Sequence, residues 1–315
     1  MTDSRILHSY QDREEKSNAG ATIFLNPRAG AGRAARKAEN VRSAFRELNF
    51  AVKLIETRSA EELRTRARAE IGAGSRKLVA MGGDGTLQLL VREVIGGEAA
   101  VGVIPVGGGN DFAAALGIES WKQAVRAIVR GRTRLVDVVK VRFENGQESR
   151  YVGGGGAGLD AEAAQHASGR FAKWPGRLRY IGAAITAFEK YPGAEFEVTS
   201  GAENKPEISG RALLAAALNT PRYGGGVRLA PDAKVDDGLL DFVVLEKLTR
   251  LEIMRLLPAL FFTGKLKTKR LKRFRAASAR VCARVPLPFH GDGELLGTTP
   301  VTIEVEPKAL RVLAP

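Results

Sequence analysis

Residues 77–90, KLVAMGGDGTLQLL, join a short apolar run to a glycine-rich turn and then to a stretch that suits a helix. The run Leu78–Met81 has the length and composition of a buried strand. The turn from Gly82 to Thr86 carries three glycines around one aspartate, an arrangement that costs backbone entropy and buries little side-chain surface. Such a turn at the end of a strand indicates a place where the backbone itself must approach a partner closely.

The same order of strand, turn and helix recurs through residues 21–137. Ser59, with Glu62 three residues later, is a start signal for a helix, and Gly131 is a stop signal for the last one. Four alternations of strand and helix predict a mainly parallel sheet that is covered on both faces. The strands are expected in ATIFL, AVKLIET, KLVAM and AVGVIPV, and the helices at about residues 32–49 and in SAEELRTRARAEI, LQLLVREVI and WKQAVRAIVRG.

The pattern changes after Asp137, where an Asn145-Gly146 pair between two alternating segments predicts a β-hairpin. The fold class is therefore an α/β N-terminal domain with a mainly parallel sheet, followed by a largely antiparallel, β-rich C-terminal domain. We expect a disordered tail at 1–20, a first domain at 21–138 that residues 303–315 are candidates to complete, and a second domain at 139–302. Its strands are expected in EFEVTS, RALLAAALN, GLLDFVVLE, ARVCARV and VTIEVE, and its helices near 159–168, 177–191 and 249–263.

The composition limits the kinds of molecule that the protein is expected to bind. The 315 residues carry a net charge of +14, which attracts nucleotides, nucleic acid or anionic lipid headgroups. Aromatic residues make up only 6% of the chain and no stretch interleaves them with basic residues, so nucleic acid is not expected as a partner. No apolar run reaches the ~18 residues that span a bilayer. A single cysteine, Cys282, excludes an internal disulfide and fits the reducing cytoplasm.

Three glycine-rich turns follow strands of the first half, at residues 26–32, 82–86 and 105–111. In open α/β sheets ligands bind at the carboxyl ends of the strands, and glycine lets backbone N–H groups approach a phosphate. The three turns together predict a polyphosphate site, although none has the Gly-Lys-Ser/Thr of a Walker A loop or the GxGxxG dinucleotide fingerprint. Asp84, which we expect in an exposed turn, would repel phosphate unless Mg²⁺ lies between them or its carboxylate accepts a hydrogen bond from ribose or adenine.

Six short blocks follow one another in the order Asn26–Gly32, Gly82–Thr86, Pro105–Phe112, Gly156–Ala161, Asp237–Asp241 and Asp292–Glu294. In this order they resemble the diacylglycerol kinase catalytic family, in particular the bacterial soluble lipid kinases related to sphingosine and ceramide kinases. The resemblance covers almost all of residues 21–313. The sequence departs from the family at Gly108, where Thr or Ser is usual, at Ala29, where Ser is usual, and at Gln88, where Asn is common.

The resemblance implies a lipid kinase that uses ATP and Mg²⁺ and has its active site in the cleft between two domains. It implies that Glu294 accepts the proton of the lipid hydroxyl, with Asp292 beside it, whereas the sequence HGDGELLG alone would favour a hairpin turn. The nucleotide-binding residues are expected to be Asn26, Pro27, Arg28, Ala29, Gly30, Thr57, Gly82, Gly83, Asp84, Gly85, Thr86, Gly108, Asn110 and Asp111.

Two metal sites are implied in the same way. Asp137 would hold Mg²⁺ through water near the phosphates, and a structural cation would bind Asp237 and the backbone carbonyls of Lys234 and Leu239. Oxygen ligands of this kind suit a hard cation such as Mg²⁺. The alternatives are a surface carboxylate at a domain boundary and an ordinary aspartate-rich turn.

The segment after residue 249 bears on the membrane. Residues 249–263 carry apolar side chains at positions 251, 254, 257 and 261, and we expect this helix to belong to the core. The basic run that follows should attract an anionic membrane, at ~1 kcal/mol for each cation near the surface. Peripheral membrane association is therefore expected, and a homodimer stays open. The basic run consists of Lys265, Lys267, Lys269, Arg270, Lys272, Arg273 and Arg275.

Other functions stay open at this point. NAD kinases carry a similar glycine-rich turn, but their usual Asn-Glu pair is replaced here by Asn110-Asp111-Phe112. A nucleotide- or lipid-binding module with a decayed site is suggested by Gly108 and Ala29, whereas the retained acidic residues argue against decay. The lipid that would be phosphorylated, whether diacylglycerol, phosphatidylglycerol, a sphingoid base or another lipid alcohol, is open as well.

Overall fold

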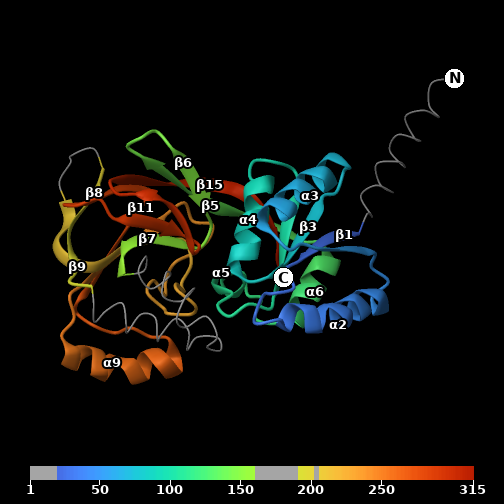
Figure 1. The fold of residues 1–315 in the computed structure, drawn as a ribbon, viewed down its shortest axis with the longest axis horizontal. Helices are drawn as coiled ribbons and strands as arrows, with labels where there is room; N and C mark the ends of the chain where they lie inside the picture. Colours follow the sequence, from blue (N-terminus) through green and yellow to red (C-terminus); the bar gives the residue numbers. More distant parts are fainter. Residues whose placement is uncertain (1–19, 160–190, 202–205) are drawn as a thin grey trace.

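The structure, a computed structural model, describes residues 20–159, 191–201 and 206–315. The tail expected at 1–20 and the helices expected near 159–168 and 177–191 therefore lie outside the described residues, apart from single residues at their ends. Figure 1 shows an α/β domain beside a β-rich domain, joined by long strands that run from one into the other.

The first domain contains the strands β1 (Ala21–Leu25), β2 (Val52–Glu56), β3 (Lys77–Gly82) and β4 (Ala100–Pro105), and the helices α2 (Arg33–Glu47), α3 (Ala60–Gly72), α4 (Asp84–Val94), α5 (Asp111–Ala115) and α6 (Trp121–Arg130). The strands pair in parallel in the order β2-β1-β3-β4. The helices α3 and α4 cover one face of this sheet, and α2 and α6 cover the other (Figure 1).

Local signals in the sequence set the ends of these helices. Ser59 Oγ accepts a hydrogen bond from the backbone N–H of Glu62 at 3.1 Å, so the start signal of α3 is confirmed. Gly131 ends α6 with a φ of 68°, as its stop signal predicted. The helix α4 begins earlier than expected, because Asp84 is already its first residue.

The second domain contains β5 (Thr133–Phe143), β6 (Glu148–Tyr151), β7 (Gly154–Gly158), β8 (Ala194–Ser200), β9 (Pro206–Leu218), β10 (Leu240–Glu246), β11 (Leu271–Ala276), β12 (Ser278–Ala283), β13 (Pro288–Gly291), β14 (Glu294–Thr298) and β15 (Val301–Leu313), and the helix α9 (Arg250–Thr263). Antiparallel pairs connect these strands in the order β14-β13-β7-β9-β8-β12-β15, with β10 beside β9 and β5 beside β15. The hairpin predicted at Asn145-Gly146 joins β5 to β6.

The strand β7 was not predicted, because four of its five residues are glycines and glycine has a low strand propensity. Its packing explains the composition. A Cβ on Gly155 would lie 2.7 Å from the carbonyl oxygen of His290 and 2.8 Å from the ring of Tyr151. Glycine therefore lets the neighbouring strand and a buried tyrosine approach this backbone closely.

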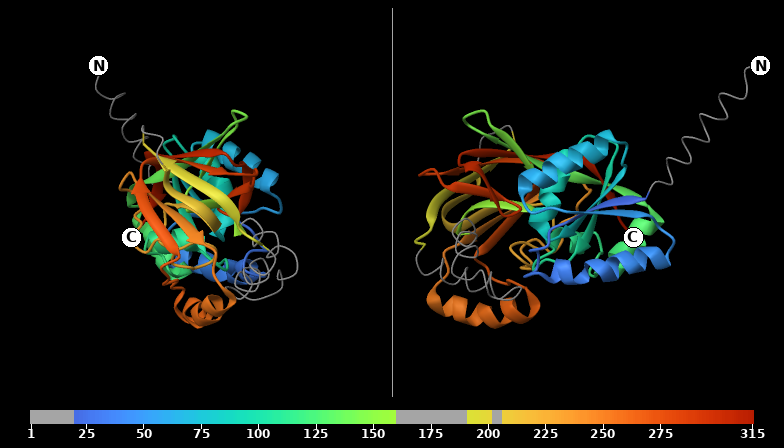
Figure 2. Two further views of the ribbon diagram at one scale, coloured as in Figure 1. Left: turned by 90° about the vertical axis from the view of Figure 1, so that its left-hand side faces the viewer. Right: turned by 45° about the vertical axis from the view of Figure 1, so that its right-hand side comes forward.

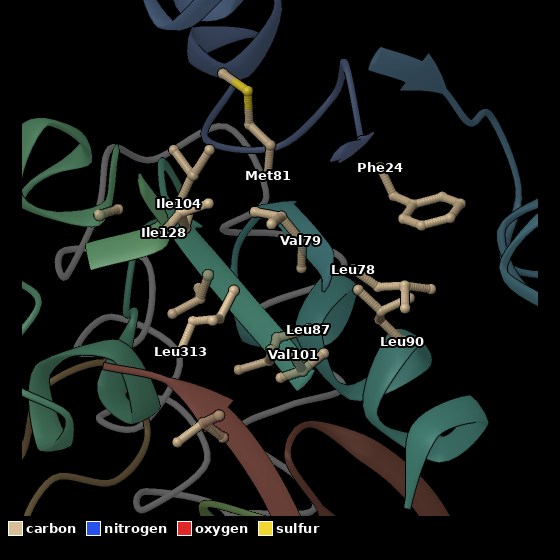
Figure 3. Packing of buried hydrophobic residues seen from close by; sticks show 14 of the residues in the cluster. Phe24, Leu78, Val79, Met81, Leu87, Leu90, Val101, Ile104, Ile128 and Leu313 are labelled. Atoms are coloured by element: carbon tan, nitrogen blue, oxygen red, sulfur yellow. The ribbon is translucent and has the colours of Figure 1, made fainter. Parts of the chain in front are cut away.

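The core of the first domain extends across its sheet to the last strand of the chain (Figure 3). Leu78, Val79 and Met81 on β3 are all fully buried, as expected for a parallel strand covered on both faces. Leu313, near the end of β15, packs in the same cluster, and β15 pairs in parallel with β4 at its C-terminal end. The final strand therefore contributes to the core of the first domain.

The strands β5 and β15 pair along most of their length and connect the two domains. Their register shifts between Glu306 and Leu310, where Lys308 has a φ of 53°. Asp137, fully buried on β5, accepts the backbone N–H of Lys308 on Oδ1 and that of Gly238 on Oδ2, each at 2.8 Å. Its carboxylate therefore satisfies backbone groups where the chain passes between the domains.

The predicted fold class is confirmed: a mainly parallel α/β domain precedes a largely antiparallel β-rich domain. Within the ranges that the structure covers, no helix has both the length and the apolar character needed to cross a bilayer.

Candidate functional site at the domain junction

The three glycine-rich loops of the first domain meet at the carboxyl ends of β1, β3 and β4. The backbone N–H of Gly107, in the third loop, donates to the carbonyl of Gly82, in the second, at 3.1 Å. Arg33, which follows the first loop, donates from Nη2 to the carbonyl of Gly107 at 2.9 Å. Asn26 Nδ2 donates to Thr86 Oγ1 at 3.2 Å, which links the first loop to the second.

The other residues expected to contact a nucleotide differ in exposure. Arg28 and Gly108 are exposed on the first and third loops. Thr57 is buried at the end of β2, and its hydroxyl donates to the carbonyl of Leu25 at 3.3 Å. The hydroxyl proton of Thr57 therefore takes part in a hydrogen bond within the sheet. Pro27, Ala29, Gly30 and Gly83 lie within the first and second loops, and Gly85 lies in the first turn of α4.

Asp84 is not exposed, contrary to the prediction. Its carboxylate accepts the backbone N–H of Asn110 at 2.8 Å and that of Phe112 at 3.4 Å. Burial raises the pKa of Asp84 above its ordinary value. Asp84 therefore ties the second loop to the third, in addition to any role toward a ligand.

A fourth glycine-rich loop, Gly224–Gly226, reaches this site from the second domain. The backbone N–H groups of Gly225 and Gly226 donate to Asp111 Oδ2 at 3.0 and 3.3 Å. The other oxygen, Asp111 Oδ1, is buried and has no hydrogen-bond partner in the described part of the chain. Burial, together with the charge of Asp84, raises the pKa of Asp111 to about 6. Sequence reasoning missed this loop, although three consecutive glycines were a visible signal.

Asp292 lies in the turn of the β13–β14 hairpin with a φ of 48°. Its Oδ2 accepts the backbone N–H of Val152 at 2.8 Å, and its Oδ1 accepts those of Gly153 and Gly154 at 3.0 Å each. Burial raises the pKa of Asp292 to about 6, and the charge of Asp84 adds to this effect. Because Asp84 belongs to the first domain and Asp292 to the second, the two carboxylates interact across the domain junction.

These carboxyl groups should make the free protein more stable in mild acid. Asp111 and Asp292 hold a proton more tightly in the folded than in the unfolded chain, so their stabilising contribution is complete below about pH 4 and is lost as the pH rises through about 6. Burial lowers the pKa of His290, which opposes this trend. Without divalent cations, Asp111 and Asp292 together should add about 1–3 kcal/mol to the free energy of unfolding at about pH 5.5 relative to about pH 8, and His290 offsets part of this gain.

Urea denaturation at the two pH values measures this difference. The double variant Asp111→Asn/Asp292→Asn should lose most of it, since neither amide titrates. A double variant with the same pH dependence as the parent would contradict the assignment.

Glu294 also reaches the first domain, but at a different point. Its Oε2 lies 2.8 Å from Arg92 Nη2. Arg92 lies two helical turns beyond Asp84 on the same face of α4, about 12 Å along the axis. Gln88, between them on that face, donates from Nε2 to the carbonyl of Arg150 at 2.6 Å. One face of α4 therefore lies against the second domain, with Glu294 at the end remote from the glycine-rich loops.

The predicted metal ligands have other partners. Both carboxylate oxygens of Asp137 accept backbone N–H groups. Asp237 accepts the backbone N–H of Leu239 and forms an ion pair with Arg275, which brings a positive charge to the place expected for a cation. Among the described residues, no group of three or more His, Cys, Asp or Glu side chains could hold a metal ion. The structural metal site predicted at Lys234, Asp237 and Leu239 stays a prediction, since two of its ligands would be backbone carbonyls rather than acidic side chains.

Comparison with known proteins agrees with this two-domain arrangement. Residues 20–141 match the model of the diacylglycerol kinase catalytic domain, and residues 153–314 match the YegS C-terminal NAD kinase beta sandwich-like domain. A "Diacylglycerol kinase" of Mycobacterium tuberculosis is 29% identical over 299 residues, which cover 93% of this chain and 94% of that protein. A "Probable lipid kinase YegS-like" of Pseudomonas aeruginosa is 32% identical over 249 residues, 78% of each chain.

Solved structures share the fold. A crystal structure of a diacylglycerol kinase from Bacillus anthracis is 17% identical, with a TM-score of 0.67, and the match covers 94% of this chain and 97% of that one. A second structure from the same organism, 20% identical, has a TM-score of 0.72 over the same shares of the two chains.

Proposed function

The chain belongs to the family of bacterial lipid kinases that carry the diacylglycerol kinase catalytic domain, and we propose that it transfers the γ-phosphate of ATP to the hydroxyl group of diacylglycerol or a related lipid. The observation that supports this proposal best is that the glycine-rich loops of the first domain meet at the domain junction, where Asp111 accepts the backbone N–H groups of Gly225 and Gly226 from the second domain. A phosphate donor held by one domain and an acceptor held by the other would meet at this junction.

The phosphates of ATP would lie against the three glycine-rich loops of the first domain. The loops converge at the carboxyl ends of parallel strands, where open α/β sheets bind ligands. The helix α4 starts at Asp84, and no side chain caps its N-terminus. Its first N–H groups and its dipole therefore favour an anion at this place.

Mg²⁺ is the cation that we propose beside those phosphates, and Asp84 and Asp111 fit it. The two carboxylates repel each other, and the buried Oδ1 of Asp111 has no hydrogen-bond donor among the described residues. Mg²⁺ is usually held by one or two carboxylates together with water and substrate phosphates, so a third acidic side chain is not required. When bound, the ion would neutralise charge on the transferred phosphate. Asp137 instead acts as a structural residue between the domains.

Asp292 is the residue that we propose as general base, in place of Glu294. Burial raises the pKa of its carboxyl group to about 6, and the charge of Asp84 adds to this rise, which suits a group that accepts a proton near neutral pH. Oδ2 accepts a single backbone N–H and keeps a free lone pair for the lipid hydroxyl. As the hydroxyl oxygen bonds to the γ-phosphorus and the bond to the β-phosphate oxygen breaks, the hydroxyl proton moves to Asp292. Glu294 instead forms an ion pair with Arg92.

The proposed substrate is a membrane lipid, and the chain has a net charge of +14. We therefore propose that the enzyme works in the cytoplasm, at the surface of an anionic membrane.

Transfer of radiolabel from γ-labelled ATP tests the proposed function. The protein should label at least one lipid from a panel of diacylglycerol, phosphatidylglycerol and a sphingoid base, in a reaction that requires Mg²⁺. Label on NAD and on no lipid would overturn it, and so would the absence of any labelled acceptor in a preparation that binds ATP.

Close contact between the second and third loops gives a further test. A Cβ on Gly107 would lie 2.5 Å from Gly83 Cα and 2.9 Å from Asn110 Oδ1. Gly107→Ala should force these loops apart and weaken ATP binding about tenfold. Gly72→Ala is the matched control, because a Cβ there, at the end of α3, would meet no atom within 4 Å and lies away from the three loops. Titration with a fluorescent ATP analogue compares the two variants; equal affinities would show that the spacing of the loops does not set nucleotide binding.

A further inference from the structure

The helix α9 has one face that the protein leaves exposed. It lies at the edge of the second domain in Figure 1 and in both views of Figure 2. Ile253 and Leu256 are partly buried against the core of that domain. On the other side, Leu251 is 55% exposed and Met254 is 68% exposed.

Exposed residues continue from Leu251 at helical spacing to form a stripe, which we call the α9 stripe: Leu251, Met254, Arg255 and Pro258. These positions follow the i, i+3, i+4, i+7 pattern of a single helix face. Two large apolar side chains and one cation on such a face are typical of a helix that lies in a membrane interface. This face was expected to belong to the core, and its exposure corrects that expectation.

Three cations of the expected basic run form ion pairs with acidic residues of the second domain. Arg270 and Lys272 form ion pairs with Glu246, and Arg275 forms one with Asp237. These cations therefore offset neighbouring acidic groups. Arg273 Nη1 donates to a backbone carbonyl at 3.4 Å.

Three lysines directly after α9 remain available. Lys265, Lys267 and Lys269 are exposed and form no ion pair with any residue that the structure describes. A β-bridge places the exposed Arg228 beside Lys265, which adds a fourth cation. A cationic group that continues from an apolar helix face is complementary to a lipid surface with anionic headgroups.

We propose that the α9 stripe and the three lysines form the surface by which this protein docks on an anionic phospholipid bilayer. The apolar side chains would enter the interface while the lysines bind headgroups. The docking surface depends on the proposed function in one respect: a lipid kinase would use it to bring the active site to a substrate in the membrane.

Sedimentation with vesicles that contain no kinase substrate tests the apolar part. Wild-type protein should bind vesicles of phosphatidylcholine mixed with phosphatidylglycerol. Leu251→Gln/Met254→Gln should bind them about tenfold more weakly. The matched control is Leu48→Gln/Val285→Gln, which changes two apolar residues that are 47% and 66% exposed elsewhere. Equal binding by the wild type and the α9 variant, or equal loss in the control, would overturn the proposal.

The three lysines of the proposed surface predict that vesicle binding depends on lipid charge and on salt. Replacing the three lysines with glutamine should weaken binding to the anionic vesicles about tenfold and leave weak binding to pure phosphatidylcholine unchanged. Salt at about 1 M, where the Debye length is about 3 Å, should have the same effect. A triple variant that binds like the wild type would overturn the proposal. The control, which removes the same charge from exposed sites of the first domain, is Arg46→Gln/Arg126→Gln/Arg130→Gln.

An assay of lipid phosphorylation in detergent tests the proposed function independently of the docking surface. The α9 variants should keep their activity there, because the surface acts only at a bilayer. Vesicle binding without kinase activity would refute the proposed function and support the docking surface. Kinase activity in detergent without binding to anionic vesicles would refute the docking surface alone.

Discussion

Asp292→Asn should retain ATP binding and lower the rate of lipid phosphorylation about 10²- to 10⁴-fold. The amide oxygen can still accept the N–H groups of Gly153 and Gly154, whereas its NH₂ group meets the N–H of Val152, and this lost hydrogen bond costs about 1–3 kcal/mol of stability. The amide cannot take up the hydroxyl proton. At saturating Mg²⁺, which would keep Asp111 deprotonated, the wild-type rate should rise with pH through about 6 as Asp292 loses its proton, and this limb should be absent from the residual activity of the variant. A purely structural role would lower the rate without removing that limb.

Glu294→Gln is the comparison that decides between the two acidic residues of the hairpin. Because the Glu294 carboxylate pairs with Arg92 on α4, its loss should change the contact between the domains and lower turnover no more than about tenfold. Single-turnover rates at saturating ATP and lipid would rank the two variants. If Glu294→Gln is the more damaging change and Asp292→Asn turns over almost normally, the base is Glu294.

The parts of the site that lie at strand ends were predictable from the sequence. Each glycine-rich turn follows a short apolar run, and parallel strands bring their carboxyl ends to one edge, so the meeting of Asn26, Gly82 and Gly107 follows from local patterns. The hairpin at Asn145-Gly146 and the cap at Ser59 were equally local. Each depends on residues a few positions apart.

The parts that depend on distant partners were not predictable in this way. Asp84 was expected to be exposed because its donors, on Asn110 and Phe112, come from a loop 26 and 28 positions further on. Periodicity carries no information about such contacts. The ion pair between Arg92 and Glu294 was not predicted for the same reason, because the two residues lie far apart in the sequence.

In the basic run after α9, distant contacts again changed the expectation. Cations that have no evident partner in the sequence form ion pairs with acidic residues in the fold. Lys272 lies on β11, beside β10, and pairs with Glu246 at 2.6 Å. Alternating charges on neighbouring strands cannot be matched before the strand register is known. The exposed cations without an acidic partner among the described residues therefore include the three lysines that precede the strand.

Asp84→Asn should abolish most of the Mg²⁺-dependent activity while leaving the protein folded. Asparagine has the same size and can accept one of the two backbone N–H groups that Asp84 accepts, but its NH₂ group meets the other donor. The lost hydrogen bond costs about 1–3 kcal/mol. Removing a buried charge that repels Asp111 and Asp292 offsets this cost. The free energy of unfolding should therefore change little. The Mg²⁺-dependent activity should be lost, because the proposed cation site needs the negative charge of Asp84.

The affected step can be identified by comparing ATP binding with and without Mg²⁺. If Asp84 holds the cation, Asp84→Asn should weaken the binding of Mg²⁺–ATP about 10- to 100-fold. ATP alone should bind at least as tightly as to the wild type, because the carboxylate no longer repels the phosphates. The stability gained between about pH 8 and about pH 5.5 should also shrink, since Asp84 contributes to the raised pKa of both Asp111 and Asp292. Equal losses of affinity with and without Mg²⁺ would instead assign Asp84 to holding the second and third loops together, and the cation site would have to be sought elsewhere.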